Sequence, residues 1–388
     1  MDTVSAETES GSDDDFFSKL EAGKNGEQEV ECQCPKGPRK SCSQGLWYCG
    51  VAAVMTARCC WACCFPPLPN FILSKFAFWP LARNYYFFQE TTVDGAAKII
   101  KLNKANKSSL NERWFMGFNH QCFPPIKTGG CEFFTVETKQ KHYLACAFVR
   151  APSGSPSYTM IYSHPSGTHL GYRFRALPSL LDIARFLNVD IVVYDYSGYG
   201  ISSGSYSEKS LFADIEGIYE HVTTVRGVYP QKIVLYGYSI GTASTISLLS
   251  EVQPRVAGVI LVAPLASMLR VFLWKRACLN KPFERHTPGV DKFTSLEKIG
   301  QVDLPLLVCH GLEDTLVPID HGQALCNAAP NTVPPLWIED GSHNDMEFSQ
   351  ELWMRMRDFL NRELPTSAIS SLSKLNTHSS EGYGNPAE

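Results

Sequence analysis

The sequence predicts an α/β fold with a mostly parallel, twisted sheet and helices on both of its faces. Short apolar and β-branched runs alternate with longer amphipathic segments from about residue 131 to residue 363, which is the pattern of strands and crossover helices. Several of the apolar runs end directly before residues with reactive side chains. Parallel sheets carry their sites at this position, the carboxyl ends of the strands.

The expected elements follow in order along the chain. The runs CEFFTVET and YLACAFVR alternate like a β-hairpin joined by Lys-Gln-Lys-His. Further strands are expected at 159–164, from 190 onward, and at 233–236, 256–264, 304–309 and 335–339. Helices are expected at 175–188, 208–225 and 351–364. Residues 264–299 interrupt the alternation, and we expect them to form a short cap.

The most informative stretch is residues 231–248. A β-branched run leads into Gly-Tyr-Ser-Ile-Gly at 237–241, and a segment of small and apolar residues follows. A G-x-S-x-G turn between a strand and a helix lifts its serine to the top of a sheet. The helix N-terminus favours negative charge there. The pattern predicts an α/β-hydrolase fold with Ser239 as the nucleophile.

A serine nucleophile needs a general base, and the base needs an orienting carboxylate. In this fold the acid precedes the histidine, and both follow the serine. The buried-strand pattern at 304–309 ends in His-Gly-Leu-Glu-Asp. We predict Asp314 as the orienting acid, with Glu313 as the nearest alternative.

The predicted base is His343, which follows the strand at 335–339 and a Gly-Ser turn. Asp314 and His343 could each simply cap a helix, but their order and their positions after strands favour a triad. Two further histidines, His310 and His164, also end strands. We expect them to pack beneath the site.

The oxyanion hole is predicted at the loop after the strand at 159–164. That loop reads His164-Pro165-Ser166-Gly167. Proline has no N–H to donate, so the N–H groups of Ser166 and Ile240 are the expected donors.

Composition narrows the class of protein. The 388 residues carry a net charge of −4 and 14 cysteines. No basic stripe indicates a nucleic-acid partner. The first residues are acidic and polar rather than typical of a secretory signal, so we expect cytosolic exposure and no disulfide framework.

The chain divides into five predicted parts. Residues 1–45 and 364–388 are expected to be disordered tails, since few apolar side chains offset their ordering entropy. Residues 46–83 form a cysteine-rich, aromatic membrane-anchor segment, and residues 84–130 an irregular linker. Residues 131–363 form the hydrolase domain.

Four cysteines in the anchor segment allow several interpretations: Cys59, Cys60, Cys63 and Cys64. A zinc site needs a second cysteine pair at suitable spacing. A transmembrane helix over 46–64 would bury Arg58 near the bilayer centre. S-palmitoylation is favoured, because two or more acyl chains hold a protein stably where one does so marginally. A buried structural cluster is the remaining alternative.

Several runs together resemble the alpha/beta-hydrolase-domain family seventeen, membrane-anchored serine hydrolases that remove palmitate from cysteines of cytoplasmic proteins. The resemblance covers about 131–363 and the cysteine-rich stretch. The runs that carry it are CCWACCFPPLP at 59–69, SKFAFWP at 74–80, YDYSGYGISSG at 194–204, LYGYSIGT at 235–242, HGLEDTLV at 310–317 and PLWIEDGSHNDME at 335–347.

The resemblance implies a palmitoyl-protein thioesterase with the triad Ser239, Asp314 and His343, and no metal or organic cofactor. It implies that the four cysteines are palmitoylated by a protein acyltransferase. The protein would then act at the cytoplasmic face of the plasma membrane and endosomes, on S-palmitoylated membrane proteins.

The chain departs from the family in three places. Its extension before Cys59 is longer, the family's His-Gly-Asn-Ala reads His-Pro-Ser-Gly at 164–167, and the cap at 264–299 is longer and more basic. Two alternative functions follow: a lipid esterase acting on monoacylglycerol or lysophospholipid through the same triad, or a membrane-bound adaptor inactivated by Pro165.

Overall fold

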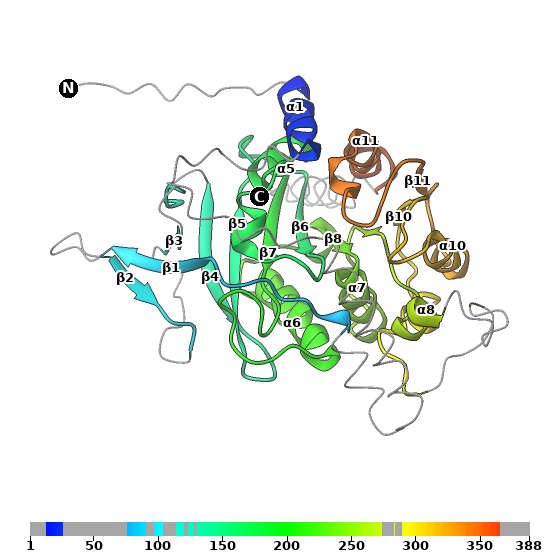
Figure 1. Cartoon of the computed structure of the whole chain (residues 1–388), viewed down its shortest axis with the longest axis horizontal. Coiled ribbons are helices and arrows are strands. Elements are labelled where there is room, and N and C mark those ends of the chain that lie inside the picture. The colour runs from blue at the N-terminus through cyan, green and yellow to red at the C-terminus, as the bar shows by residue number, and fades with distance from the viewer. Residues whose placement is uncertain are drawn as a thin grey trace, which may run out of the picture.

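The main sheet is mostly parallel, as the sequence predicts (Figure 1). The computed structural model describes residues 13–25, 76–90, 97–103, 114–119, 123–127, 130–273, 283 and 289–364. Among these residues the main sheet has eight strands in the order β11-β10-β9-β8-β6-β7-β5-β4. The pairs from β11 through β7 are parallel, whereas β5 runs antiparallel to both β7 and β4.

The strands and helices have the following bounds in the described part of the chain. The strands are β4 (Cys131–Glu137), β5 (Tyr143–Val149), β6 (Tyr158–Ser163), β7 (Val189–Tyr194), β8 (Ile233–Tyr238), β9 (Gly258–Val262), β10 (Leu306–Gly311) and β11 (Leu336–Ile338). The helices are α1 (Asp13–Lys24), α4 (Leu170–Arg173), α5 (Leu180–Leu187), α6 (Glu208–Glu220), α7 (Ile240–Glu251), α8 (Met268–Leu273), α9 (Ser295–Ile299), α10 (Ile319–Ala328) and α11 (Gln350–Asp358).

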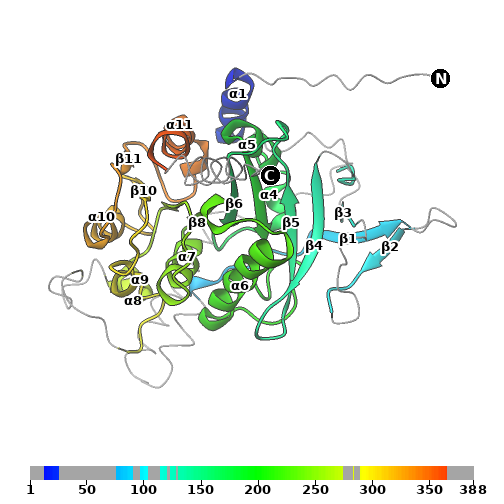
Figure 2. The same cartoon turned by 180° about the vertical axis from the view of Figure 1, so that it is seen from behind.

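Helices cover both faces of the sheet (Figures 1 and 2). One core joins the sheet to α1, α4, α5 and α11, and the other joins it to α6, α7, α9 and α10. Successive strand residues point to opposite faces. In β6, for example, Met160 and Tyr162 belong to the first core and Ile161 to the second. The predicted α/β-hydrolase fold, with helices on both faces, is confirmed.

Helix α5 is shorter than the helix expected at 175–188. It begins after Ser179, whose hydroxyl accepts the Asp182 N–H while the Asp182 carboxylate accepts the Ser179 N–H. This reciprocal capping box fixes the start of the helix. The helix ends at Asn188, which has a left-handed conformation with φ = 52°.

Strand order reverses at β6, and this reversal positions the site. The chain pairs β7 on one side of β6 and β8 on the other. A crevice forms at the carboxyl ends of the strands at such a point, because the loops leave in opposite directions. The loops after β6 and β8 meet there, and they carry Ser166 and Ser239.

Residues 84–130 differ from the irregular linker that the sequence predicts. They contain β1 (Tyr85–Glu90), β2 (Ala97–Ile100) and β3 (Phe115–Phe118), an antiparallel sheet with β1 in the centre. This sheet lies beside β4 in both views (Figures 1 and 2). The Phe87 ring lies 5.3 Å from that of Phe133 in β4. Burial of such aromatic rings against the main sheet stabilises strands too short to be evident from sequence.

Helix α1 lies within the tail expected to be disordered. It packs beside α5 and α11 (Figures 1 and 2). The Phe16 ring stacks on Phe186 with centroids 4.1 Å apart, and Lys19 Nζ lies 2.7 Å from the Asp182 carboxylate. The local composition is polar, so only these contacts with the folded domain account for an ordered helix.

The membrane-anchor prediction falls largely on positions beyond the described ranges. Residues 46–75, with all four cysteines, and the tail from 365 onward lie outside the described residues. No helix in the described part of the chain is long and apolar enough to cross a membrane.

Phe16→Ala should undock α1. Removing a buried phenylalanine ring costs about 3–5 kcal/mol, and Phe16 is buried between α5 and α11. We expect amide hydrogen exchange, followed by mass spectrometry, to accelerate over residues 13–24 while β6 and β8 stay protected. The exposed matched change Glu21→Ala should leave exchange unaltered. Equal exchange in Phe16→Ala and the native protein would contradict this docking.

Candidate active site

The predicted nucleophile lies at the turn between β8 and α7. Ser239 has φ = 54° and ψ = −118°, a conformation that costs a residue with a side chain about 1–3 kcal/mol. Its N–H donates to the Val262 carbonyl at 2.9 Å, which ties the turn to β9. This strained strand-to-helix turn has the geometry of a nucleophile elbow.

Two glycines allow the turn to pack against its neighbours. A Cβ at Gly241 would lie 2.2 Å from the Ser163 carbonyl oxygen at the end of β6. A Cβ at Gly237 would lie 2.6 Å from the Gly241 carbonyl oxygen. Both contacts are with backbone, which cannot move aside. The G-x-S-x-G spacing is therefore a steric requirement of this site.

The structure brings Ser239, His343 and Asp314 together. Ser239 Oγ lies 2.8 Å from His343 Nε2, and His343 Nδ1 lies 2.6 Å from Asp314 Oδ2. All three side chains are buried. The acid thus holds the imidazole with Nδ1 protonated and leaves Nε2 free to accept the serine proton.

The Asp314 carboxylate is held by hydrogen bonds on both oxygens. Oδ1 accepts the N–H groups of Leu316 and Val317 at 2.9 and 2.7 Å, and Oδ2 accepts His310 Nε2 at 3.2 Å as well as His343. Burial favours the protonated carboxyl, but the hydrogen bonds from the two histidines hold the pKa of Asp314 well below its ordinary value. The carboxylate is therefore ionised at neutral pH.

The alternatives to these residues lie elsewhere. Glu313 is exposed, whereas Asp314 beside it is buried. His310 is buried and donates from Nε2 to the Val317 carbonyl at 2.7 Å, so it supports the acid loop. His164 is buried at the end of β6.

A buried acid that sequence reasoning missed supports the His343 loop. The Glu347 carboxylate accepts the hydroxyls of Tyr162 and Tyr236 at 2.6 and 2.9 Å. It also pairs with Arg173 at 2.7 Å. The Tyr238 hydroxyl donates to the His343 carbonyl at 2.5 Å. The alternating tyrosines of β6 and β8 are a sequence signal for such a polar layer.

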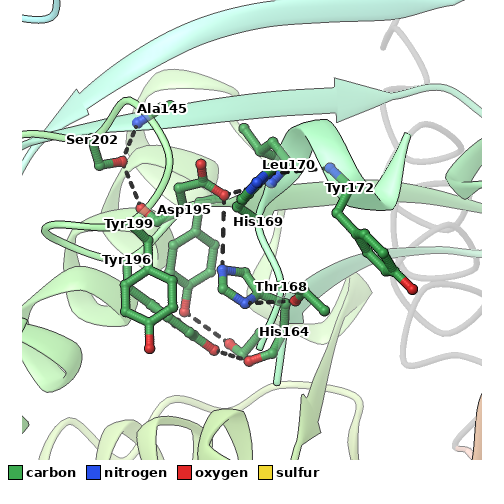
Figure 3. Close-up of polar contacts among 12 residues, drawn as sticks. Ala145, His164, Thr168, His169, Leu170, Tyr172, Asp195, Tyr196, Tyr199 and Ser202 are labelled. Atoms are coloured by element: carbon green, nitrogen blue, oxygen red, sulfur yellow. Dashed lines mark hydrogen bonds and ion pairs between the residues drawn. The ribbon is translucent and has the colours of Figure 1, made fainter. Parts of the chain in front are cut away.

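The loop after β6 rests on a second buried network (Figure 3). The ring of His164 lies between Thr168 and Asp195, with Nδ1 3.1 Å from the Thr168 hydroxyl. Burial lowers the pKa of His164 to about 3, so the ring is neutral. Its 3.8 Å approach to Asp195 is therefore not an ion pair.

Asp195 follows β7 directly and is not among the site residues predicted from the sequence. Its Oδ1 accepts the Leu170 N–H at 2.6 Å, and its Oδ2 pairs with the Tyr85 hydroxyl of β1. Burial raises the pKa of Asp195 from 3.8 to about 7, although both hydrogen bonds oppose this. The small sheet thus contacts Asp195, which lies beside His164 at the start of the loop after β6.

The described residues show no metal site, since no group of three or more His, Cys, Asp or Glu side chains converges among them. A surface pocket of about 440 Å³ lies beside Asp314. Neither Ser239 nor His343 lines it, so it lies on the outer side of the acid loop.

Known proteins resemble this chain over most of its length. It is 36% identical to alpha/beta hydrolase domain-containing protein 17C of Xenopus tropicalis, over 79% of this chain and 95% of that protein. It is 32% identical to protein 17B of Homo sapiens, over 79% of this chain and 96% of that protein. The chain belongs to the alpha/beta hydrolase domain-containing protein 17 family.

Two further comparisons concern a wider family and a solved structure. The family described as serine aminopeptidase S33 matches residues 182–291. An esterase from Pyrococcus furiosus is similar in structure, with a TM-score of 0.47 and 20% identity, over 60% of this chain and 92% of that chain. As a member of family 17 with this fold, the chain is a serine hydrolase.

Asp195→Asn should flatten the pH dependence of stability. Between pH values of about 4 and 7, the unfolded chain releases the Asp195 proton while the folded chain retains it, so stability falls as pH rises. Asparagine does not titrate. Between pH 5 and 8, the melting temperature of the native protein should therefore fall by more than that of the variant. Calorimetry at several pH values measures this difference.

The exposed matched change Asp340→Asn should keep the native slope. Burial also raises the pKa of Asp214 to about 7. The Asp195→Asn variant should therefore keep part of the dependence of stability on pH. Identical slopes in Asp195→Asn and the native protein would show that Asp195 titrates normally in the fold.

Proposed function

We propose that this protein is a palmitoyl-protein thioesterase, which hydrolyses S-palmitoyl cysteine on membrane-associated proteins through Ser239, His343 and Asp314. The hydrogen-bonded chain from serine to histidine to aspartate carries the proposal. Membership of family 17 and the sequence resemblance to membrane-anchored depalmitoylases support the choice of substrate.

In the acylation step, Ser239 Oγ attacks the thioester carbonyl carbon and His343 Nε2 takes the hydroxyl proton. The tetrahedral oxyanion accepts hydrogen bonds from the backbone N–H groups of Ser166 and Ile240. Ile240 is the first residue of α7, where the helix dipole favours negative charge. When the carbon–sulfur bond breaks, the cysteine leaves with the proton from His343 and palmitate stays on Ser239.

Deacylation repeats the chemistry with water. His343 removes a proton from the attacking water, and the acyl-serine bond breaks as Ser239 regains its proton. Asp314 stays ionised and stabilises the imidazolium formed in each step, because its pKa is held well below the ordinary range. Each step balances without a metal or organic cofactor.

Substrate choice follows from attachment to a membrane surface. We propose that a protein acyltransferase palmitoylates Cys59, Cys60, Cys63 and Cys64, and that the protein acts at the cytoplasmic face of the plasma membrane and endosomes. Phe76 follows Cys64 by 12 positions, so at about 3.5 Å per residue the two can be at most about 40 Å apart. The active site would therefore stay close to the bilayer.

The triad residues should fail together when changed. Ser239→Ala should abolish labelling by a fluorophosphonate probe, and Ser239→Ala and His343→Ala should each lower kcat on a soluble ester by roughly 10⁵–10⁶-fold. Asp314→Asn should cost about 10⁴-fold, because it reverses the preferred imidazole tautomer. The matched change Glu313→Gln should stay near the native rate. If Asp314→Asn kept the native kcat and Glu313→Gln were inactive, Glu313 and not Asp314 would be the acid.

Two substrates separate the candidate enzymes in the same assay. Release of palmitate from a palmitoyl-cysteine peptide supports the thioesterase, whereas preferential turnover of monoacylglycerol supports a lipid esterase. An unlabelled Ser239 in the native protein would support an inactive adaptor.

Changing Cys59, Cys60, Cys63 and Cys64 together to Ser should release the protein from membranes, because single interfacial contacts bind only marginally. Cell fractionation with and without hydroxylamine, which cleaves thioesters, is the measurement. The variant should still hydrolyse a soluble ester but not membrane-bound acylated proteins. The control Cys326→Ser should remain membrane-bound.

Retention of the quadruple variant in the pellet after alkaline carbonate washing would overturn acylation as the anchor. Residues 46–64 would then be assigned to a membrane-spanning segment.

A further inference from the structure

The oxyanion loop is held from beneath by the network in Figure 3. The Tyr196 hydroxyl donates to the His164 carbonyl at 2.5 Å, and the Thr168 hydroxyl donates to the Pro165 carbonyl at 3.1 Å. These contacts hold His164 and Pro165 at the start of the loop and join them to Tyr196 and Thr168. They do not reach Ser166, whose N–H is the proposed oxyanion donor.

Ser166 is held from the other side, by the segment that follows the cysteine-rich stretch. Its hydroxyl donates to the Ala77 carbonyl at 2.7 Å and accepts the Trp79 N–H at 2.9 Å. The Ser166 hydroxyl also lies 3.1 Å from the Tyr199 hydroxyl. The Tyr199 hydroxyl in turn accepts a hydrogen bond from the same Trp79 N–H at 3.0 Å. One side chain thus joins the loop to the backbone on two sides of Phe78.

The segment at 76–79 is itself fixed to the domain. Ala77 and Phe78 are buried. The Phe78 ring lies 5.2 Å from Tyr206 and 5.8 Å from Phe293. The Phe76 ring lies 4.7 Å from Phe272 of α8. Ser166 therefore bonds to a segment that is packed against the domain and also contacts α8.

The loop needs such a support because of its sequence. Pro165 has no N–H to bond and a fixed φ. The following Gly167 is open, because a Cβ added there would meet no atom within 4 Å. An oxyanion donor must be aimed to within about 0.5 Å to be effective.

We propose that the Ser166 side chain is a positioning residue, which aims its own backbone N–H by hydrogen bonding to Ala77 and Trp79. The segment adjoining the membrane anchor is then part of the support of the active site. This inference rests on the proposed function, because it assumes that the Ser166 N–H receives the oxyanion.

Ser166→Ala is the direct test, since it removes the hydroxyl and keeps the N–H. We expect kcat on a soluble p-nitrophenyl ester to fall between about 10- and 100-fold, with KM changed less than about two-fold. Ser166→Thr keeps a hydroxyl and should recover most of the rate. The pH profile of kcat/KM should not move, because the Ser239–His343–Asp314 chain is untouched.

A second pair of variants tests the same contact from the other side. Trp79→Pro removes the N–H that donates to Ser166, whereas the matched change Trp79→Ala keeps it. Trp79→Pro should reproduce the loss of kcat and Trp79→Ala should not. In the double variant with Ser166→Ala, the two losses should not multiply, because each change already removes the hydrogen bond between Trp79 and Ser166.

Each of these results would overturn the proposal: a native kcat in Ser166→Ala, no recovery in Ser166→Thr, or losses that multiply in the double variant. A shifted pH profile would instead assign the effect to the triad and contradict it equally. If the native enzyme cleaves the ester but not a palmitoyl-cysteine peptide, the thioesterase function fails while the Ser166 comparison, made on the ester, still stands.

Discussion

The active site depends on a close backbone contact between the start of α7 and the end of β6. At Gly241 the helix approaches the Ser163 carbonyl so closely that a Cβ would lie 2.2 Å from its oxygen. Ser239, two residues earlier, has a positive φ, and its N–H is bonded to β9. Because β6 is also the strand at which sheet order reverses, the contact joins the nucleophile turn to the oxyanion loop. Any loss of this approach would separate the two.

Two buried acids support the site from beneath in different ways. Glu347 is matched by Arg173 and by two tyrosine hydroxyls, so its charge is compensated and the His343 loop is fixed. Asp195 has neutral partners, and burial raises its pKa to about 7. Asp195 can hold the loop by hydrogen bonds whether it is protonated or ionised. Because its pKa differs between the folded and unfolded chain, the stability of the protein then varies with pH.

The N-terminal part of the chain belongs structurally to the hydrolase domain. Helix α1 packs on α5 and α11, the segment at 76–79 bonds to Ser166, and Tyr85 of β1 reaches Asp195. These contacts come from two described stretches, residues 13–25 and 76–90, that precede the main sheet in sequence. A segment with a proposed role in membrane attachment thus also contacts the machinery proposed for catalysis, which relates the position of the protein to the geometry of its site.

The sequence alone predicted the α/β-hydrolase fold and the three residues proposed as the triad, because each is tied to a local signal. Ser239 lies between two glycines, and Asp314 and His343 each follow an apolar strand run; parallel pairing then places these positions at one edge. Tertiary structure decided what local signals cannot encode. Helix α1 and the strands β1 and β3 form only because their aromatic rings are buried against distant elements. Tyr85 lies 110 positions from Asp195 and Ala77 lies 89 from Ser166, so neither contact has a sequence period. Their hydrogen bonds exist only once the chain is folded.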